Sequence, residues 1–306
     1  MSDFNATSDN ASANRRSLLF TGGLVAAGAA LAAGLARPAA AQAQAQASEA
    51  LIDKWVRTKK ITLGYEFGTP PMQYRDPTTN EPAGYTIELA KLLAADLGEG
   101  ITIDYVEVPF GQLFALLESG RCDMIEPVTN LPARALRGDF TPIPAFYAPV
   151  YVGLKPNSTV QKPEDLNAEN IRFATLQGTS QLAVARRTFP KAQFASFPSA
   201  TDAINEVASG RADATVQSSS SIVRALDAGA RIKLLPTGAL YLESVSFFMR
   251  QGDPRTLNWM SNWIGYHASI GTLATLYERF VGTASREKYK LQTVAVGPAG
   301  QPIRSN

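Results

Sequence analysis

The chain has 306 residues, and its 29 lysines and arginines are nearly balanced by 27 aspartates and glutamates. This balance excludes the strongly cationic surface that binding to nucleic acid or to an anionic membrane requires. Hydrophobic residues make up 45% of the chain, which is enough for the core of one large or two ordinary α/β domains. A discrete pocket is therefore the expected functional site.

The N-terminal segment has the pattern of an export signal. The pair Arg15–Arg16 directly precedes a hydrophobic run over Leu18–Ala36, and small residues follow as far as Ala41. The pair resembles a twin-arginine signal, although Asn14 stands where that signal usually has serine or threonine. We predict an export signal over 1–41, cleaved after Ala41 or a few residues later, and a periplasmic mature protein. A permanent membrane anchor is the alternative, but the many alanines and glycines make the run weakly hydrophobic.

Residues 42–56 are predicted to form a flexible leader, rich in alanine and glutamine at its start, with ordered structure beginning near Leu51. The single cysteine, Cys122, lies far from the signal, so it can serve neither lipid attachment at the cleavage site nor an intramolecular disulfide. Together with the single histidine, His267, it provides too few soft ligands for zinc or copper. We expect no metal and no cofactor, and a packing or surface role for His267.

The first half of the mature chain alternates predicted strands and helices. A strand is predicted over 61–65, and an amphipathic helix over 85–97 that ends at a glycine. Residues 101–108 alternate hydrophobic and polar side chains as a strand does, and leucines at helical spacing over 113–117 are followed by Gly120 as a helix stop. This order favours a parallel sheet covered by helices.

The second half repeats the theme, with strands predicted over 171–175 and 213–216 and helices over 180–188 and 199–209. A Gly-Thr turn follows the first strand of each half. Ligands bind beyond the carboxyl ends of strands in open α/β sheets, so two such halves facing each other would form a cleft.

Two extended stretches, 149–155 and 244–250, could be the crossing strands of a hinge, and 254–281 is predicted to return to the first half as helices. The predicted fold is therefore α/β and two-lobed, each lobe being a mostly parallel sheet with helices on both faces. The predicted first lobe consists of residues 57–150 and 246–285. The predicted second lobe is 151–245, and residues 286–306 form a C-terminal tail.

Short motifs follow one another in a specific order from Ile61 to Gly282. They are Gly64 with Pro70–Pro71, Gly84–Ala90, Leu117–Asp123, Arg134 with Phe140–Pro142, Gln177–Ser180, Ala208–Ala214 and Gly252–Pro254. In this order and spacing the chain resembles the periplasmic polar amino-acid-binding proteins of ABC importers, which are family-3 extracellular solute-binding proteins.

The resemblance implies roles for individual residues. Arg134 matches the arginine that binds the ligand carboxylate, and a planar guanidinium can bind both carboxylate oxygens at once. Thr129 matches a polar contact to the same ligand, while Thr179 and Ser180 belong to the second-lobe turn that completes its hydrogen bonds. The alternatives are a solvated surface arginine and hydroxyl groups that only stabilise their turns.

Other positions shape the expected pocket. Glu66 stands where the family often has an acidic cleft residue, and Thr69 where many members have an aromatic side chain over the ligand. Ser218 stands where the family usually has the aspartate that pairs with the ligand ammonium, and serine cannot neutralise that charge. Glu126 together with Glu66 is the candidate replacement. Otherwise Glu126 is a structural glutamate, and a ligand without an ammonium becomes preferable.

The resemblance implies a monomeric solute-binding protein of amino-acid transport. It would close by hinge motion around an amino acid or related carboxylate and deliver it to the permease of an ABC transporter. One alternative is a periplasmic accessory protein of the same fold that binds a partner enzyme, which the unusual Ser218 and Thr69 favour. The other is an enzyme resembling cyclohexadienyl dehydratase, although the acidic group which those enzymes keep at the position of Ser218 is absent, and Glu126 alone is left as an acid.

Overall fold

The computed structural model describes residues 49–282, 287–297 and 299–305, which belong to one compact unit. The predicted export signal, its cleavage site and the first part of the predicted leader lie outside these residues. No helix within the described ranges is long and hydrophobic enough to cross a membrane.

Strands and helices alternate along most of the chain. The first half contains α1 (Leu51–Thr58), β1 (Lys60–Tyr65), β2 (Gly68–Thr69), β3 (Gln73–Arg75), β4 (Pro82–Ala83), α2 (Tyr85–Leu97), β5 (Thr102–Glu107), the 3₁₀ turn η2 (Phe110–Gln112), α3 (Leu113–Glu118), β6 (Met124–Thr129), α4 (Pro132–Ala135), β7 (Asp139–Phe140) and β8 (Phe146–Leu154). The second half contains the 3₁₀ turn η3 (Pro163–Leu166), β9 (Arg172–Leu176), α5 (Ser180–Thr188), β10 (Gln193–Phe197), α6 (Ala200–Ala208), β11 (Ala214–Ser218), α7 (Ser219–Asp227), β12 (Lys233–Leu234), β13 (Tyr241–Met249), α8 (Pro254–Ser269), α9 (Thr272–Tyr277), the π-helical turn η4 (Glu278–Gly282), β14 (Thr293–Val296) and β15 (Pro302–Ser305).

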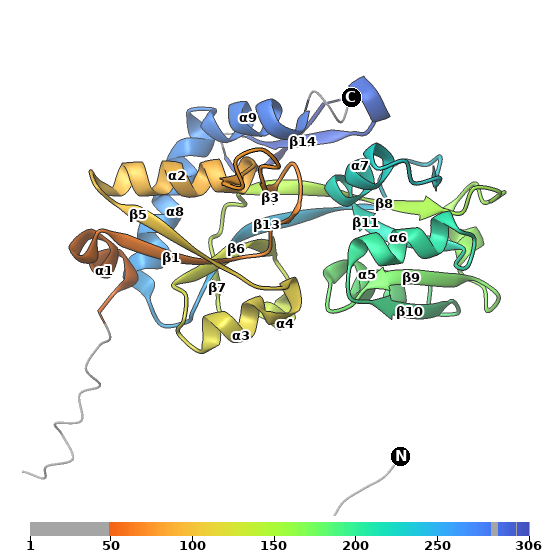
Figure 1. The fold of residues 1–306 in the computed structure, drawn as a ribbon, viewed down its shortest axis with the longest axis horizontal. Coiled ribbons are helices and arrows are strands. Elements are labelled where there is room, and N and C mark those ends of the chain that lie inside the picture. Colours follow the sequence, from red (N-terminus) through yellow and green to blue (C-terminus); the bar gives the residue numbers. More distant parts are fainter. Residues whose placement is uncertain (1–48, 283–286, 298, 306) are drawn as a thin grey trace, which may run out of the picture. The chain divides into compact units, whose positions relative to one another are not determined.

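A ten-stranded sheet extends through two lobes in the order β10-β9-β11-β8-β13-β6-β1-β5, with β12 paired to β8 and β7 to β13. In the first lobe β1 is parallel to β5 and β6, and in the second lobe β9 is parallel to β10 and β11. The long strands β8 and β13 are antiparallel to each other and pass between the two groups (Figure 1). This arrangement confirms the predicted two-lobed α/β fold.

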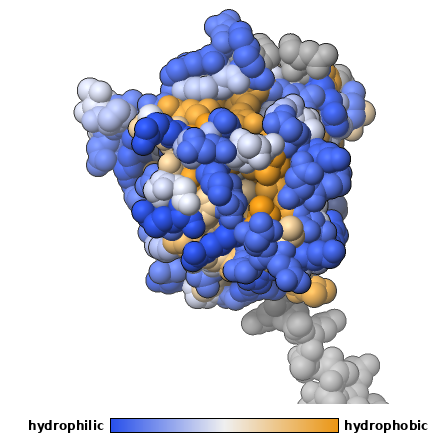
Figure 2. Space-filling model, turned by 90° about the vertical axis from the view of Figure 1, so that its right-hand side faces the viewer, coloured by the Kyte–Doolittle hydropathy of each residue, from blue (hydrophilic) through white to orange (hydrophobic). Residues whose placement is uncertain are grey.

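The second lobe has a hydrophobic core of its own, in which the ring of Phe173 stacks on Phe189 and Phe194 at centroid distances of 5.0 and 5.2 Å. Figure 2 looks onto the end of the molecule that carries this lobe and shows hydrophilic residues over most of the surface, with hydrophobic ones deeper between them. The large hydrophobic side chains that are exposed belong to the first lobe and the C-terminal segment: Val56, Leu136, Tyr266, Ile270 and Ile303. Within the described residues, the second lobe therefore keeps such side chains inside.

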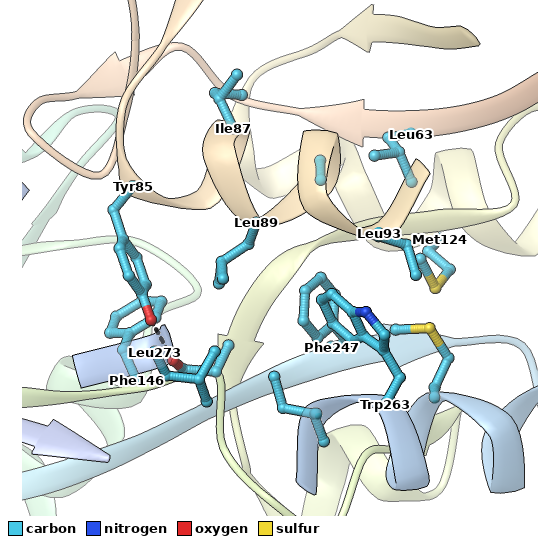
Figure 3. Packing of buried hydrophobic residues seen from close by; sticks show 14 of the residues in the cluster. Leu63, Tyr85, Ile87, Leu89, Leu93, Met124, Phe146, Phe247, Trp263 and Leu273 are labelled. Atoms are coloured by element: carbon cyan, nitrogen blue, oxygen red, sulfur yellow. Dashed lines mark hydrogen bonds between the residues drawn. The ribbon is translucent and has the colours of Figure 1, made fainter. Parts of the chain in front are cut away.

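The core of the first lobe lies between the sheet and α2, α8 and α9. Leu93 of α2, Phe247 of β13 and Trp263 of α8 lie together in it (Figure 3), and each is at most 6% exposed. The helix α2 starts after Gly84, whose φ is 117° and whose missing Cβ would lie 2.5 Å from the backbone oxygen of Met72. Only glycine allows this approach. It fixes the loop that carries Met72 against the helix.

The predicted flexible leader over 42–56 is wrong at its C-terminal end, because residues 51–58 form α1. Leu51, Ile52 and Trp55 are buried on one face of this helix, and Trp55 is 0% exposed. The indole N–H of Trp55 donates to Asp123 Oδ2 at 3.0 Å. The predicted start of ordered structure near Leu51 agrees with α1, so the leader was drawn too long only in its stated end at residue 56.

The predicted C-terminal tail contains a hairpin rather than only an extension of the chain. Strands β14 and β15 pair antiparallel, and Val294 and Val296 of β14 are buried. The hydroxyl of Tyr147 on β8 donates to the backbone oxygen of Gly300 at 2.6 Å, and Tyr151 of the same strand accepts from the backbone N–H of Gln292 at 2.9 Å. The hairpin thus packs along a crossing strand.

Candidate functional site

A cavity of about 550 Å³ lies between the two lobes, a volume in the range typical of small-molecule sites. All eight residues that the sequence singles out as ligand contacts line it: Glu66, Thr69, Glu126, Thr129, Arg134, Thr179, Ser180 and Ser218. They come from β6, from the ends of β1 and β11, from β2, and from α4 and the start of α5. Their contact with a ligand stays a prediction, but the structure brings them into one cavity.

Arg134 of α4 holds a buried positive charge in this cavity. Its side chain is 7% exposed and lies over the rings of Phe110 and Phe114, at 5.7 and 5.1 Å from guanidinium carbon to ring centroid. Nη1 donates to the backbone oxygen of Thr129 at 3.0 Å, and no carboxylate of the described chain forms an ion pair with it. Burial lowers the pKa of Arg134 to about 10, while the negative charges of Glu243 and Glu126 raise it. The group therefore stays cationic at neutral pH.

Hydroxyl groups from the second lobe line the same cavity as this arginine. Ser180 is 2% exposed, and its Oγ donates to Thr129 Oγ1 of the first lobe at 3.3 Å. Thr179 caps the N-terminus of α5 by accepting from the Leu182 N–H at 3.3 Å, and its hydroxyl donates to the backbone oxygen of Leu176 at 2.8 Å. Thr179 therefore has a structural role in addition to its place in the cavity wall.

Two acidic residues lie close together in the cavity: Glu126 within β6, and Glu66 directly after β1. Glu126 is 3% exposed and accepts from the Glu66 N–H at 2.7 Å and from Gln73 Nε2 at 3.1 Å. Burial raises the pKa of Glu126 well above its usual range, and the Glu66 charge adds to this. Thr69 donates to Glu66 Oε2 at 3.1 Å. Within the described ranges no group of three or more His, Cys, Asp and Glu residues is placed to hold a metal ion.

Replacing Glu126 with glutamine tests the raised pKa. A carboxyl with a raised pKa in the folded state binds more protons folded than unfolded, so its contribution to stability declines as the pH rises above 4.5. We expect Glu126→Gln to remove a slope of up to about 1.4 kcal/mol per pH unit from the free energy of unfolding and to stabilise the protein at neutral pH. Urea unfolding between acidic and neutral pH measures this. Parallel curves for wild type and variant would contradict the shift.

Ser218 is engaged in local structure. It caps the N-terminus of α7, accepting from the Ser221 N–H at 3.5 Å, and its hydroxyl lies 3.0 Å from Ser220 Oγ. The position where the resembling family carries an acidic group is therefore occupied by a neutral helix cap. That Ser218 cannot neutralise a ligand ammonium stays a prediction.

Sequence reasoning missed three charged residues of the cavity, Glu107, Arg224 and Glu243. Glu243, on the crossing strand β13, is 5% exposed, and Arg224 of α7 donates to the backbone oxygen of Gly68 in the opposite lobe at 2.5 Å. The predicted crossing strand began at residue 244, so it excluded Glu243, which is the next acidic residue upstream. Ser244 and Ser246 make the strand only partly hydrophobic, so no local signal set Glu243 apart.

Comparisons with known proteins agree with this geometry. The family model for bacterial extracellular solute-binding proteins, family 3, matches residues 61–283. The chain is 23% identical over 236 residues to the L-cystine-binding protein TcyA of Bacillus subtilis (strain 168), covering 75% of this chain and 85% of that protein. Among solved structures, the ancestral amino acid-binding protein AncCDT-1, a precursor of cyclohexadienyl dehydratase, is 28% identical with a TM-score of 0.66, covering 76% of this chain and 99% of that chain. The cysteine-binding protein of Campylobacter jejuni shares the fold at 20% identity and a TM-score of 0.68, covering 84% of this chain and 100% of that chain.

Proposed function

The chain belongs to the bacterial extracellular solute-binding proteins of family 3, and on this basis we propose that it captures an amino acid or related small carboxylate in the periplasm for delivery to an ABC transporter. The relatives named for L-cystine and for amino acids support such a ligand. The observation that carries the proposal is Arg134, a buried guanidinium that lines the cavity and forms no ion pair within the described chain. A buried cation of this kind is costly unless an anion joins it.

Binding would proceed by closure of the two lobes around the solute. The ligand carboxylate would bind Arg134, and the hydroxyl of Ser180 at the N-terminus of α5 would approach it from the second lobe, where the helix dipole favours an anion. The contact between Arg224 and the Gly68 carbonyl oxygen joins the lobes at the cavity edge. Because a ligand shifts an open–closed equilibrium only through its higher affinity for the closed form, contacts from both lobes are what the mechanism requires.

A thermal-shift screen of L-amino acids, amines and small carboxylates tests the proposal, with L-cystine among the first compounds. A ligand present at 100 times its Kd is expected to stabilise the protein by about 2.7 kcal/mol, because it binds the folded state alone. At least one amino acid should give such a shift. A panel without any shift would reject the proposal and favour the accessory protein that binds a partner enzyme.

Delivery and export require tests in cells. Cells that lack the protein should take up less of the radiolabelled ligand than cells that have it, and reintroduction of the gene should restore uptake. The N-terminus of the mature protein, determined by mass spectrometry of a periplasmic fraction, tests export and cleavage after Ala41. Unchanged uptake in cells that lack the protein would show that it binds the ligand without a role in transport.

A dehydratase is the second candidate, because Glu126 is a buried acid in the cavity with a raised pKa, as general acid catalysis at neutral pH requires. The likeness to a precursor of cyclohexadienyl dehydratase adds to this. Incubation of the pure protein with prephenate or arogenate decides between the two. We expect no turnover. If the wild type turned over either compound and Glu126→Gln did not, the protein would be an enzyme rather than a binding protein.

A further inference from the structure

Glu243 is a buried carboxylate at the place where the two lobes meet. It lines the cavity from the crossing strand β13. Its Oε2 accepts from Thr129 Oγ1 of the first lobe at 3.1 Å and from Gln181 Nε2 of the second lobe at 2.9 Å, while Oε1 accepts from the Tyr241 hydroxyl at 3.0 Å. All three donors are neutral, and within the described chain no lysine, arginine or histidine forms an ion pair with it. Its charge is therefore hydrogen-bonded but not neutralised.

Thr129 connects this carboxylate to Arg134. The backbone oxygen of Thr129 accepts from Arg134 Nη1 at 3.0 Å, and its hydroxyl donates to Glu243 at 3.1 Å. A buried cation and a buried anion thus lie on two sides of one residue without closing into an ion pair. An α-amino acid carries a carboxylate and an ammonium on one carbon atom, so it can satisfy both groups at once.

The other acidic groups of the cavity are placed differently. Glu126 is hydrogen-bonded to Glu66 and Gln73, and no hydrogen bond links it to Thr129 or Arg134. Glu107 is about half exposed and forms an ion pair with Arg75 at 2.8 Å. Glu243 is therefore the acidic group that shares a hydrogen-bonding residue with the carboxylate-binding arginine.

The electrostatic environment of Glu243 is suited to binding a cation. Burial raises the pKa of Glu243 above its usual range, while the surrounding hydroxyl groups and the charge of Arg134 lower it. A ligand ammonium beside the carboxylate would favour its ionised form further. The pocket would then exchange a costly isolated charge for a charge pair supported by three hydrogen bonds.

We propose that Glu243 binds the ammonium group of an α-amino acid whose carboxylate is bound by Arg134, and that it makes the site specific for amino acids over carboxylates that lack this group. The inference rests on the proposed function, because it takes Arg134 as the carboxylate receptor. The ligand ammonium would lie beside Gln181 of the second lobe, so the same interaction would also favour closure.

The test compares compounds that differ only at the ammonium. The probes are the standard L-amino acids with L-cystine and, for the amino acid that binds most tightly, the 2-hydroxy acid in which a hydroxyl replaces the ammonium. Isothermal titration measures both against the full exported chain. The wild type is expected to prefer the amino acid by about 100-fold, and Glu243→Gln to lose this preference by weakening amino-acid binding about 100-fold while changing hydroxy-acid binding by less than about threefold.

Two further variants keep the result interpretable. Glu243→Asp preserves the charge and should retain part of the preference, which separates a charge effect from a folding defect. Glu107→Gln removes a carboxylate that lines the same cavity but already has a partner in Arg75, so it should change both affinities by less than about threefold. Circular dichroism checks that each variant is folded.

The outcomes separate this inference from the proposed function. A wild type that binds no amino acid overturns both. A wild type that binds an amino acid, with the preference intact in Glu243→Gln, overturns the role of Glu243 alone. The same holds if Glu126→Gln removes the preference and Glu243→Gln does not, since the ammonium would then lie at the other acidic group.

Discussion

Replacing Arg134 with alanine is expected to raise the Kd for a carboxylate ligand about 1,000-fold, enough to abolish any shift in a thermal screen. Each charge-assisted hydrogen bond to a carboxylate contributes about 1.5–3 kcal/mol, and a guanidinium can form two at once. Lysine at this position keeps the charge but loses the planar fork, so Arg134→Lys should weaken binding by an intermediate factor. Isothermal titration with the best ligand of the screen measures all three proteins.

Arg137 provides a matched control for this substitution. Its guanidinium also lies over the ring of Phe114, at 5.4 Å, but it pairs with Glu118 at 2.6 Å and does not line the cavity. Arg137→Ala should therefore leave the affinity unchanged. The unliganded Arg134→Ala protein should be at least as stable as the wild type, because it no longer buries a charge without an ion-pair partner. Normal binding by Arg134→Ala would remove Arg134 from the site.

The fold could be predicted where local signals agree with the tertiary structure. The predicted helices over 85–97 and 180–188 match α2 and α5, since Gly84 and Gly98 bound the first and Thr179 caps the second. Strand β10 was not predicted. It is short and lies at the sheet edge, so its residues show only partial burial and its hydrophobic pattern is weak. A strand with so weak a pattern is missed from the sequence, whereas helices with clear capping residues are found.

Some residues of the candidate site could also be predicted from the sequence, and others could not. Residues that follow a recognisable motif, such as Arg134 and Ser180, could be assigned to the cavity from the sequence. Glu243 could not, because its significance arises from contacts with Thr129 and Gln181, which are 114 and 62 residues away along the chain. Nothing local distinguishes it from an acidic residue at the exposed end of a strand. The pairing of β13 with β6 and β8 places Glu243 where it can reach both groups.

Replacing Trp55 with alanine is expected to lower the free energy of unfolding by about 3–5 kcal/mol, the usual range for removing a fully buried tryptophan. Trp55 packs in the core of the first lobe, and its N–H donates to Asp123, whose Oδ1 accepts from Lys54 Nζ at 2.6 Å. Asp123 Oδ2 also accepts from the Thr62 N–H at 3.0 Å, so the indole helps to hold α1 against the start of β1. Urea unfolding followed by circular dichroism measures the change.

Two variants divide this effect into packing and hydrogen bonding. Trp55→Phe keeps most of the buried surface and loses the N–H, so it should lower stability by about 1–2 kcal/mol, including the smaller ring. Val56→Ala alters the neighbouring position on the same helix, where the side chain is 44% exposed, and should stay within about 0.5 kcal/mol of the wild type. If Trp55→Ala were as stable as Val56→Ala, α1 would contribute nothing to the folded core, and a flexible leader extending to residue 56 would be the better description.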